Sequence, residues 1–184
     1  MAKENLKKLL QEKALTKGVE IKLASGQSSS YYINCKGVTL HGPSLRVLCQ
    51  VWVEELSKIS PKPSQIAGVS VGGDPIVAGF IYEAAIRSWE LEGLLVRKEA
   101  KKHGLSAGKA VEGPAPSKDK IVYLLEDVVS TGGSLISAAQ NLIQEGYNLK
   151  GVFCIVDRQM GGAERILHDL GLPLKSIFKV EELL

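Results

Sequence analysis

The stretch "IVYLLEDVVSTGGS", residues 121–134, decides how this chain folds and where its chemistry lies. Mostly aliphatic residues run into two adjacent acids, Glu126 and Asp127, and the acids run into a loop of hydroxylated residues and glycines. A short apolar run of this kind is typical of a strand that is buried on both faces. We therefore expect a buried strand over residues 120–127, with the acid pair at its carboxyl end.

Comparable apolar runs recur through residues 61–184 and alternate with segments of helical spacing. This alternation predicts an α/β fold, with a central parallel sheet and helices on both faces in a Rossmann-like arrangement. In such sheets, ligands bind beyond the carboxyl ends of the strands. The further strands are expected at 65–71, 91–97, 149–157 and 175–180, and the helices at 75–89 (with Asp74 as N-cap), 134–146 and 162–171.

The first sixty residues have a different pattern. A helix is expected from apolar residues at helical spacing, with Gly18 ending it. Two short strands, 19–26 and 28–37, and a helix over 43–58 follow. Residues 1–60 are thus predicted to form a small lobe over the core of residues 61–184. The apolar residues of the first helix are Leu6, Leu9, Leu10, Ala14 and Leu15.

Composition excludes several classes of protein. The net charge of +3 and the aromatic content of 5% argue against a nucleic-acid partner. The odd number and wide spacing of Cys35, Cys49 and Cys154 indicate neither a zinc site nor a disulfide framework, and free thiols fit a cytoplasmic protein. The N-terminal segment lacks the apolar core of a signal peptide, and no apolar run is long enough to cross a membrane.

The loop after the acid pair has the composition of an anion site. Its glycines allow backbone N–H groups to turn inward, and Ser130, Thr131 and Ser134 add hydroxyl donors. The helix that follows contributes the positive end of its dipole, so the loop suits a phosphate monoester. It is not the GxxxxGK[ST] loop of nucleoside triphosphatases, because no lysine follows the glycines. On composition alone, an ordinary strand-to-helix turn explains the loop equally well.

The acid pair favours the functional interpretation. Two neighbouring carboxylates at a strand end repel each other, which makes a purely structural role unfavourable. From an extended strand, Glu126 and Asp127 can diverge toward two adjacent hydroxyls such as a ribose diol. Carboxylates there also stabilise positive charge that develops on the sugar.

Strand, acid pair and "VVSTGGS" together resemble the phosphoribosyl pyrophosphate signature of the type I phosphoribosyltransferases. The resemblance implies that Glu126 and Asp127 act in catalysis and contact the ribose diol. It also implies that the loop holds the 5′-phosphate of phosphoribosyl pyrophosphate. The loop residues are Val128, Val129, Ser130, Thr131, Gly132, Gly133 and Ser134.

The stretch "VRKEAKKHGLSAG", residues 96–108, covers Arg97 and most of the polar loop at 98–112. It resembles the flexible catalytic loop of orotate phosphoribosyltransferases. Mobile cations suit a leaving pyrophosphate, although the residues alone also fit a solvated basic loop. The resemblance implies that Arg97, Lys98, Lys101 and His103 bind phosphoribosyl pyrophosphate, and that Lys101 and His103 are catalytic.

Two further segments resemble the same family. "IKLASGQSSSYYIN", residues 21–34, matches the N-terminal segment that lines the orotate pocket from the small lobe. "VDRQMGGAE", residues 156–164, matches the segment whose arginine reads the base. A guanidinium fork suits a planar anion, and Tyr32 is a candidate wall for its ring. The implied orotate-binding residues are Ser25, Gly26, Tyr31, Tyr32, Ser130 and Arg158.

The chain departs from the family pattern at two places. Ala24 stands where many relatives have lysine, and "VGGDP", residues 71–75, replaces a segment that often carries a cation. Backbone amides of Gly72 and Gly73 are therefore expected to help bind the pyrophosphate. Lys102, where many relatives have aspartate, is expected to compensate in part.

The resemblance implies one reaction: orotate and phosphoribosyl pyrophosphate give orotidine 5′-monophosphate and pyrophosphate, a step of UMP biosynthesis. It also implies Mg²⁺, held mainly by substrate oxygens rather than by protein ligands, and a homodimer with shared active sites. Two alternatives remain open from the sequence. One is a phosphoribosyltransferase for a purine base, and the other is a regulatory protein that binds phosphoribosyl pyrophosphate.

Overall fold

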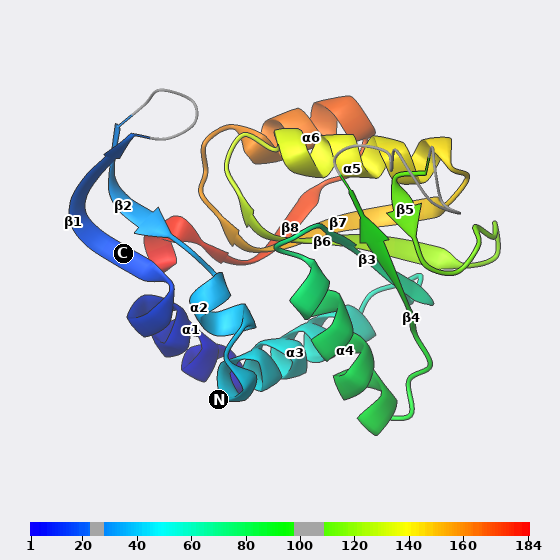
Figure 1. The fold of residues 1–184 in the computed structure, drawn as a ribbon, viewed down its shortest axis with the longest axis horizontal. Coiled ribbons are helices and arrows are strands. Elements are labelled where there is room, and N and C mark those ends of the chain that lie inside the picture. Colours follow the sequence, from blue (N-terminus) through cyan, green and yellow to red (C-terminus); the bar gives the residue numbers. More distant parts are fainter. Residues whose placement is uncertain (23–27, 98–108) are drawn as a thin grey trace.

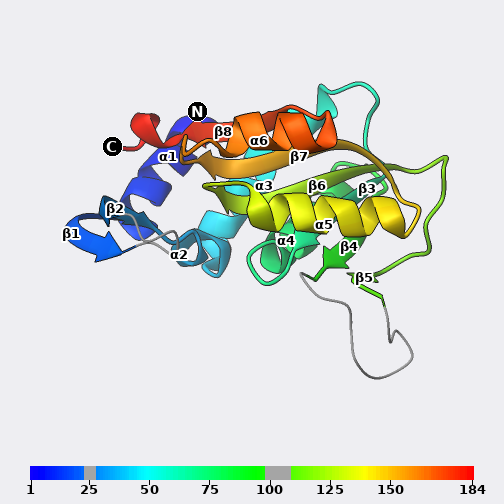
Figure 2. The same cartoon turned by 90° about the horizontal axis from the view of Figure 1, so that it is seen from above.

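The structure, a computed structural model, describes residues 1–22, 28–97 and 109–184. It confirms the predicted α/β class, with a mostly parallel sheet between two layers of helices (Figures 1 and 2). Within the described residues, none of the helices is long and apolar enough to span a membrane.

The central sheet has the strand order β5-β4-β3-β6-β7-β8 among the described residues. Strands β4, β3, β6, β7 and β8 run parallel, and the short β5 pairs antiparallel with β4 at one edge. The carboxyl ends of β3, β6 and β7 therefore meet at one side of the sheet. The bounds are β3 (Gln65–Val69), β4 (Glu92–Val96), β5 (Val111–Glu112), β6 (Ile121–Val129), β7 (Asn148–Asp157) and β8 (Leu174–Lys179).

Helices cover both faces of this sheet. On one face lie α1 (Ala2–Lys13), α3 (Gly42–Ser57) and α4 (Asp74–Ile86), and on the other lie α5 (Gly133–Gln144) and α6 (Gly162–Leu170) (Figure 1). Successive residues of β6 alternate between the two hydrophobic clusters, as the period of a strand requires. Tyr123 and Leu125 pack toward α3 and α4, whereas Val122 and Leu124 pack toward α5.

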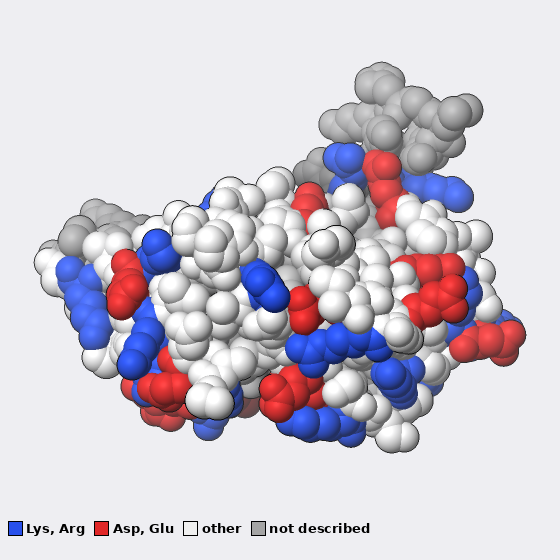
Figure 3. Space-filling view, turned by 90° about the horizontal axis from the view of Figure 1, so that it is seen from below, with Lys and Arg blue, Asp and Glu red and all other residues white. Residues whose placement is uncertain are grey.

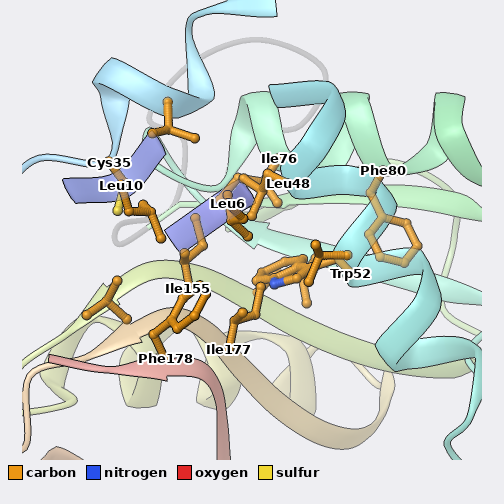
Figure 4. Packing of buried hydrophobic residues seen from close by; sticks show 14 of the residues in the cluster. Leu6, Leu10, Cys35, Leu48, Trp52, Ile76, Phe80, Ile155, Ile177 and Phe178 are labelled. Atoms are coloured by element: carbon orange, nitrogen blue, oxygen red, sulfur yellow. The ribbon is translucent and has the colours of Figure 1, made fainter. Parts of the chain in front are cut away.

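The cluster beneath α3 and α4 joins residues that are far apart in the sequence. Leu6 from α1, Trp52 from α3 and Phe80 from α4 meet Ile155 and Phe178 from the sheet (Figure 4). The rings of Trp52 and Phe80 pack edge to face with their centroids 6.4 Å apart. The first helices and the sheet therefore share one buried core. The predicted boundary at residue 60, between a small lobe and the core, stays a prediction.

The N-terminal elements differ in detail from the predicted ones. Helix α1 ends at Lys13, and Gly18, predicted to end that helix, lies inside strand β1 (Leu15–Lys22) with φ +75°. Strand β1 pairs antiparallel with β2 (Ser28–Ile33), and its register shifts between Lys17 and Ile21. The glycine therefore serves the irregular part of a strand rather than a helix cap. A short α2 (Lys36–Thr39), not predicted, and a final 3-10 helix (Val180–Glu182) complete the described elements.

Two predicted boundaries near the acid pair were also wrong. Strand β6 does not end at Asp127 but continues to Val129, where Val128 and Val129 pair with Val156 and Asp157 of β7. The acids thus lie within the last four residues of a paired strand. Asp74, predicted as an N-cap, is the first residue of α4 and follows the cap residue Gly73.

Candidate active site

The turn from β6 to α5 forms a cradle, defined here as residues 128–134, around a pocket of about 300 Å³. Gly132 has φ +77°, a left-handed conformation that glycine adopts without steric cost. Its carbonyl accepts the N–H of Ile136 at 2.9 Å, so the helix starts directly beneath the turn. The positive end of the α5 dipole therefore points into the pocket. The pocket is lined by Glu126, Val128, Val129, Ser130, Thr131, Gly132, Gly133, Ser134 and Leu135.

Helix α6 supports the cradle from behind. A Cβ on Gly162 would lie 2.4 Å from the carbonyl oxygen of Ser130 and 2.8 Å from Cγ1 of Val129. A Cβ on Gly132 would lie 3.0 Å from Cγ1 of Ile166 in the same helix. Helix α6 can approach the backbone of Ser130 this closely only because residue 162 is glycine.

The acid pair lies at the mouth of this pocket. Glu126 is only 7% exposed and lines the pocket, and its Oε1 accepts the N–H of Asp127 at 3.3 Å. The Oδ1 of Asp127 accepts the N–H of Val128 at 2.8 Å. Because neighbouring side chains of a strand point to opposite faces, the two carboxylates diverge as the sequence predicted.

Asp127 lies against the neighbouring turn from β3 to α4, residues 70–74. A Cβ on Gly72 would lie 2.9 Å from the carboxylate carbon of Asp127. In this turn, the hydroxyl of Ser70 donates to Oδ1 of Asp74 at 2.7 Å, and the N–H of Gly73 donates to the carbonyl of Val69 at 2.7 Å. The structure thus brings predicted residue Gly72 beside Asp127, whereas predicted residue Gly73 packs against the end of β3.

A buried thiol lies close to the same carboxylates. Burial raises the pKa of Cys35 well above its usual value, and the charges of Asp127 and Glu126 raise this pKa further. The pKa of Cys154 is also raised, first by burial and then by Asp157 and Glu126. Both thiols are therefore protonated near neutral pH, which keeps further negative charge away from the acid pair.

Arg158 connects the cradle with the N-terminal hairpin. Its backbone N–H donates to the carbonyl of Val129 at 2.8 Å, and its Nη1 donates to Oγ of Ser130 at 3.4 Å. Its guanidinium carbon lies 5.0 Å from the ring centroid of Tyr31. Three of the residues predicted to bind the base, Ser130, Tyr31 and Arg158, thus lie together. Tyr32, on the opposite face of β2, is 43% exposed.

Arg97 follows strand β4 and forms an ion pair with Glu112 of β5, with Nη2 and Oε1 3.0 Å apart. Its backbone N–H donates to the carbonyl of Ala110 at 2.8 Å. The other predicted residues of this group, Lys98, Lys101 and His103, lie outside the described residues, as do Lys102, Ala24, Ser25 and Gly26.

Sequence reasoning missed two polar residues of α5 near this site. Asn141 Nδ2 donates to the carbonyl of Arg97 at 3.0 Å, and Oε1 of Glu145 accepts the N–H groups of Ala110 and Val111 at 2.7 and 3.2 Å. Their partners are backbone groups 34 to 44 residues away in the chain, so the local sequence carried no signal for them.

The strand order, the acid pair and the cradle together define a type I phosphoribosyltransferase. A scan against protein-family models gives no match. Whole-chain comparison finds orotate phosphoribosyltransferases, among them that of Thermosynechococcus vestitus, 39% identical over 88% of this chain and 82% of the relative. That of Aquifex aeolicus is 32% identical and covers 100% of this chain and 98% of the relative.

A solved structure agrees with these relatives. The orotate phosphoribosyltransferase of Mycobacterium tuberculosis, in complex with Fe(III) dicitrate, superposes with a TM-score of 0.82 at 26% identity, over 100% of this chain and 99% of that one. This chain belongs to the orotate phosphoribosyltransferase family of pentosyl-transferring enzymes.

Proposed function

We propose that the chain transfers the ribose 5-phosphate of phosphoribosyl pyrophosphate to N1 of orotate, giving orotidine 5′-monophosphate and pyrophosphate in de novo pyrimidine biosynthesis. Membership of the family supports this reaction. The structural observation that carries it is the convergence of three features at one edge of the sheet: the cradle, the acid pair and Arg158. They match the phosphate, the sugar and the base of the product.

The cradle binds the 5′-phosphate in this proposal. The N-terminus of α5 and the hydroxyls of Ser130, Thr131 and Ser134 surround a pocket of about 300 Å³ that a phosphate group fits. Carboxylates Glu126 and Asp127 then accept hydrogen bonds from the ribose hydroxyls. These charge-assisted bonds hold the sugar with its anomeric carbon facing away from the phosphate pocket.

The acid pair also contributes to the chemical step. As the bond to pyrophosphate breaks, positive charge develops on the ribose ring, and two fixed carboxylates stabilise it without reorganising. N1 of orotate attacks the anomeric carbon with inversion of configuration while the C1–O bond to pyrophosphate breaks, and the proton of N1 passes to the leaving pyrophosphate. The raised pKa of Cys35 leaves a neutral thiol beneath the pair, so Glu126 and Asp127 remain the local negative charges.

Arg158 recognises the base. Its guanidinium lies over the ring of Tyr31 and is tied to the hydroxyl of Ser130, so it is held near the sugar site. A planar donor fork suits the carboxylate and carbonyl oxygens of orotate, which neutral purine bases do not offer in the same pattern. Ser25, Gly26 and Tyr32 belong to the same proposed pocket.

The pyrophosphate binds between the β3–α4 turn and the basic segment after β4. Gly72 offers a backbone amide beside Asp127, whereas the N–H of Gly73, also predicted to bind the substrate, already donates to the carbonyl of Val69. Arg97, Lys98, Lys101 and His103 supply positive charge, and Lys101 and His103 stabilise or protonate the leaving group.

Mg²⁺ is the proposed cofactor, and the residues near the sugar site fit it. The site offers the hard oxygen donors of Glu126 and Asp127, and in the described part of the chain no three His, Cys, Asp or Glu side chains form a metal-binding group. Mg²⁺ bound to phosphates usually keeps its waters and takes only one or two carboxylates. We therefore assign its ligands mainly to substrate oxygens. When bound, the ion neutralises charge on the leaving pyrophosphate.

We further propose a cytoplasmic homodimer with shared active sites. The three free, buried cysteines suit a reducing compartment. On α4, Tyr82 is 71% exposed and Ile86 62% exposed, beside a groove of about 450 Å³ between α3 and α4. A large exposed apolar patch favours burial against a second copy. Light scattering of the purified protein tests this, and a monomeric mass at assay concentration would contradict it.

Neither a nucleic acid nor a membrane is a proposed partner. The face below α3 and α4 carries acidic and basic side chains side by side, without a continuous basic stripe (Figure 3). A nucleic-acid surface concentrates Lys and Arg on one face.

One assay tests the proposed reaction. Pure protein is incubated with Mg²⁺, phosphoribosyl pyrophosphate and, in separate reactions, orotate, adenine, guanine, hypoxanthine or uracil. We expect orotate absorbance to fall and pyrophosphate to appear only with orotate. Turnover of a purine instead would favour the purine enzyme, and tight substrate binding without turnover of any base would favour a regulatory protein.

A further inference from the structure

Helix α5 contacts the chain on both sides of residues 98–108. Asn141 and Glu145 lie four residues apart, on one face of the helix. Asn141 donates to the carbonyl of Arg97, the last described residue before that segment. Glu145 accepts two backbone N–H groups, from Ala110 and Val111, just after it. We define this set of contacts as the stem anchor.

Two contacts of Arg97 with the residues after the segment complete the stem anchor. The N–H of Arg97 donates to the carbonyl of Ala110 at 2.8 Å, which holds these two described residues side by side. The guanidinium of Arg97 forms its ion pair with Glu112 at 3.0 Å. The backbone of Arg97 is thus held by Ala110 and by Asn141 of α5, and its side chain is paired with Glu112.

The stability of helix α5 does not explain why residue 145, at its C-terminus, is a glutamate. Glu145 is the C-cap residue of α5, where a negative charge faces the negative end of the helix dipole. The last turn of α5 carries no basic residue to offset this repulsion. Two charge-assisted hydrogen bonds to backbone N–H groups compensate for it. The carboxylate thus contributes to the position of Ala110 and Val111 rather than to the helix.

The same helix begins at the cradle. Helix α5 has 12 residues from Gly133 to Gln144, so the cradle and the stem anchor are separated by at most about 18 Å of rigid helix. Its buried residues pack against the sheet along its length. A rigid helix with one ligand site at its start and an anchor at its end fixes the distance between them.

We propose that Asn141 and Glu145 are positioning residues for the transferase reaction. They fix Arg97, Ala110 and Val111 relative to the cradle, and thus the pyrophosphate end of the substrate relative to its 5′-phosphate end. This inference rests on the proposed function. Neither residue touches the reacting atoms, and both act through Arg97 and the backbone of residues 110–111.

The test compares Glu145→Ala, Glu145→Gln and Asn141→Ala with the wild-type protein. The exposed neighbour Gln140 provides the control variant Gln140→Ala on the same helix. Steady-state kinetics give kcat and KM for phosphoribosyl pyrophosphate. Calorimetric titration with ribose 5-phosphate measures the cradle and acid pair alone, because this ligand lacks the pyrophosphate.

We expect Glu145→Ala to lower kcat/KM for phosphoribosyl pyrophosphate about tenfold or more, because small misplacements of catalytic groups have effects of this size. Affinity for ribose 5-phosphate should stay within about twofold of wild type, since that ligand makes no contact beyond the cradle and the acids. Glu145→Gln keeps an acceptor oxygen and should recover most of the loss. Asn141→Ala should show a smaller loss with the same pattern.

Three outcomes would overturn the proposal. Wild-type kinetics in Glu145→Ala and Asn141→Ala would show that the anchor has no part in the reaction. An equal loss of ribose 5-phosphate affinity would show general damage to α5. A loss in Glu145→Gln as large as in Glu145→Ala would exclude rescue by the acceptor. If Glu145→Ala does not fold, Glu145→Gln and Asn141→Ala decide. Inactivity of the wild type with orotate would instead refute the proposed function.

Discussion

Two glycine-containing turns lie at the carboxyl ends of the neighbouring strands β3 and β6, and they are built differently. In the cradle after β6, the hydroxyls of Thr131 and Ser134 face a pocket. In the turn after β3, the hydroxyl of Ser70 is bonded to the carboxylate of Asp74, and the amide of Gly73 is bonded to the strand. The first turn presents side-chain donors, whereas the second uses its polar side chains internally.

Under the proposed function, this difference suits the two turns to different ends of one substrate. A phosphate monoester is small and fits a cradle of hydroxyls at a helix N-terminus. A pyrophosphate carries more charge, and the β3–α4 turn contains no cation between Ser70 and Asp74. The charge must therefore come from elsewhere. Asp127, which lies against Gly72 and next to Glu126, marks the point where the two halves meet.

The largest effect is expected for Lys101→Ala, which removes positive charge from the pyrophosphate half. We expect kcat to fall about 100-fold or more, as for loss of a charge partner in the transition state. Stopped or continuous assays of orotate consumption measure it. Lys150→Ala, an equal change of charge at an exposed position near the start of β7, serves as the control. A Lys101→Ala enzyme with most of its turnover would exclude Lys101 from the mechanism.

The next largest effect is expected at the junction of the two halves. Asp127→Asn should raise KM for phosphoribosyl pyrophosphate and lower kcat, each by about tenfold, because a charge-assisted hydrogen bond to the sugar is weakened. Initial rates at varied substrate concentration separate the two constants. The exposed Asp119→Asn should match wild type. Normal values of both constants in Asp127→Asn would contradict the assignment to the ribose diol.

A smaller effect should separate the two turns directly. Thr131→Ala removes a cradle hydroxyl and should weaken ribose 5-phosphate binding by a few-fold to about tenfold. Ser70→Ala removes a hydroxyl of the other turn and should leave that affinity unchanged, while lowering the melting temperature because Asp74 loses its donor. Titration calorimetry and thermal unfolding measure the two quantities. Equal loss of affinity in both variants would remove the proposed distinction.

The smallest effect at neutral pH concerns Cys35, beneath the acid pair. Its folded pKa is raised, first by burial, so the folded state keeps a proton that the unfolded state releases above about pH 9. This contribution to stability is complete below the unfolded pKa and is lost as the pH rises toward the folded pKa, by up to about 1.4 kcal/mol per pH unit. Urea unfolding between pH 8 and 10.5 should show a shallower decline for Cys35→Ala. Identical slopes would contradict the raised pKa.

Sequence patterns predicted the sheet and most of the cradle for a clear physical reason. Strands buried on both faces must be apolar throughout, and a loop that binds phosphate must be rich in glycine and hydroxyls. The acid pair also diverges as predicted, because neighbouring side chains of a strand alternate. Its position was misjudged, because charge usually marks the end of a buried strand, whereas β6 continues through both acids to Val129.

The features that the sequence patterns did not predict depend on contacts between residues that are distant in the chain. Gly18 was interpreted as a helix stop, but the pairing of β1 with β2 places it inside a strand. The role of Glu145 depends on two amides 34 and 35 residues away. The contact of Arg158 with Tyr31 joins the end of β7 to the N-terminal hairpin. Local spacing cannot reveal such contacts, since they arise only when the sheet is assembled.

The double attachment of Arg158 to the cradle limits how the enzyme can be redesigned. Its main chain is bonded to Val129 and its guanidinium to Ser130, so the group that we propose selects the base is built into the wall of the proposed phosphate cradle. Engineering this scaffold to accept a different nucleobase by exchanging the arginine alone would also disturb the grip on the ribosyl donor. A variant with a new base preference would have to be selected for retained donor affinity at the same time, with changes at the ends of both β6 and β7.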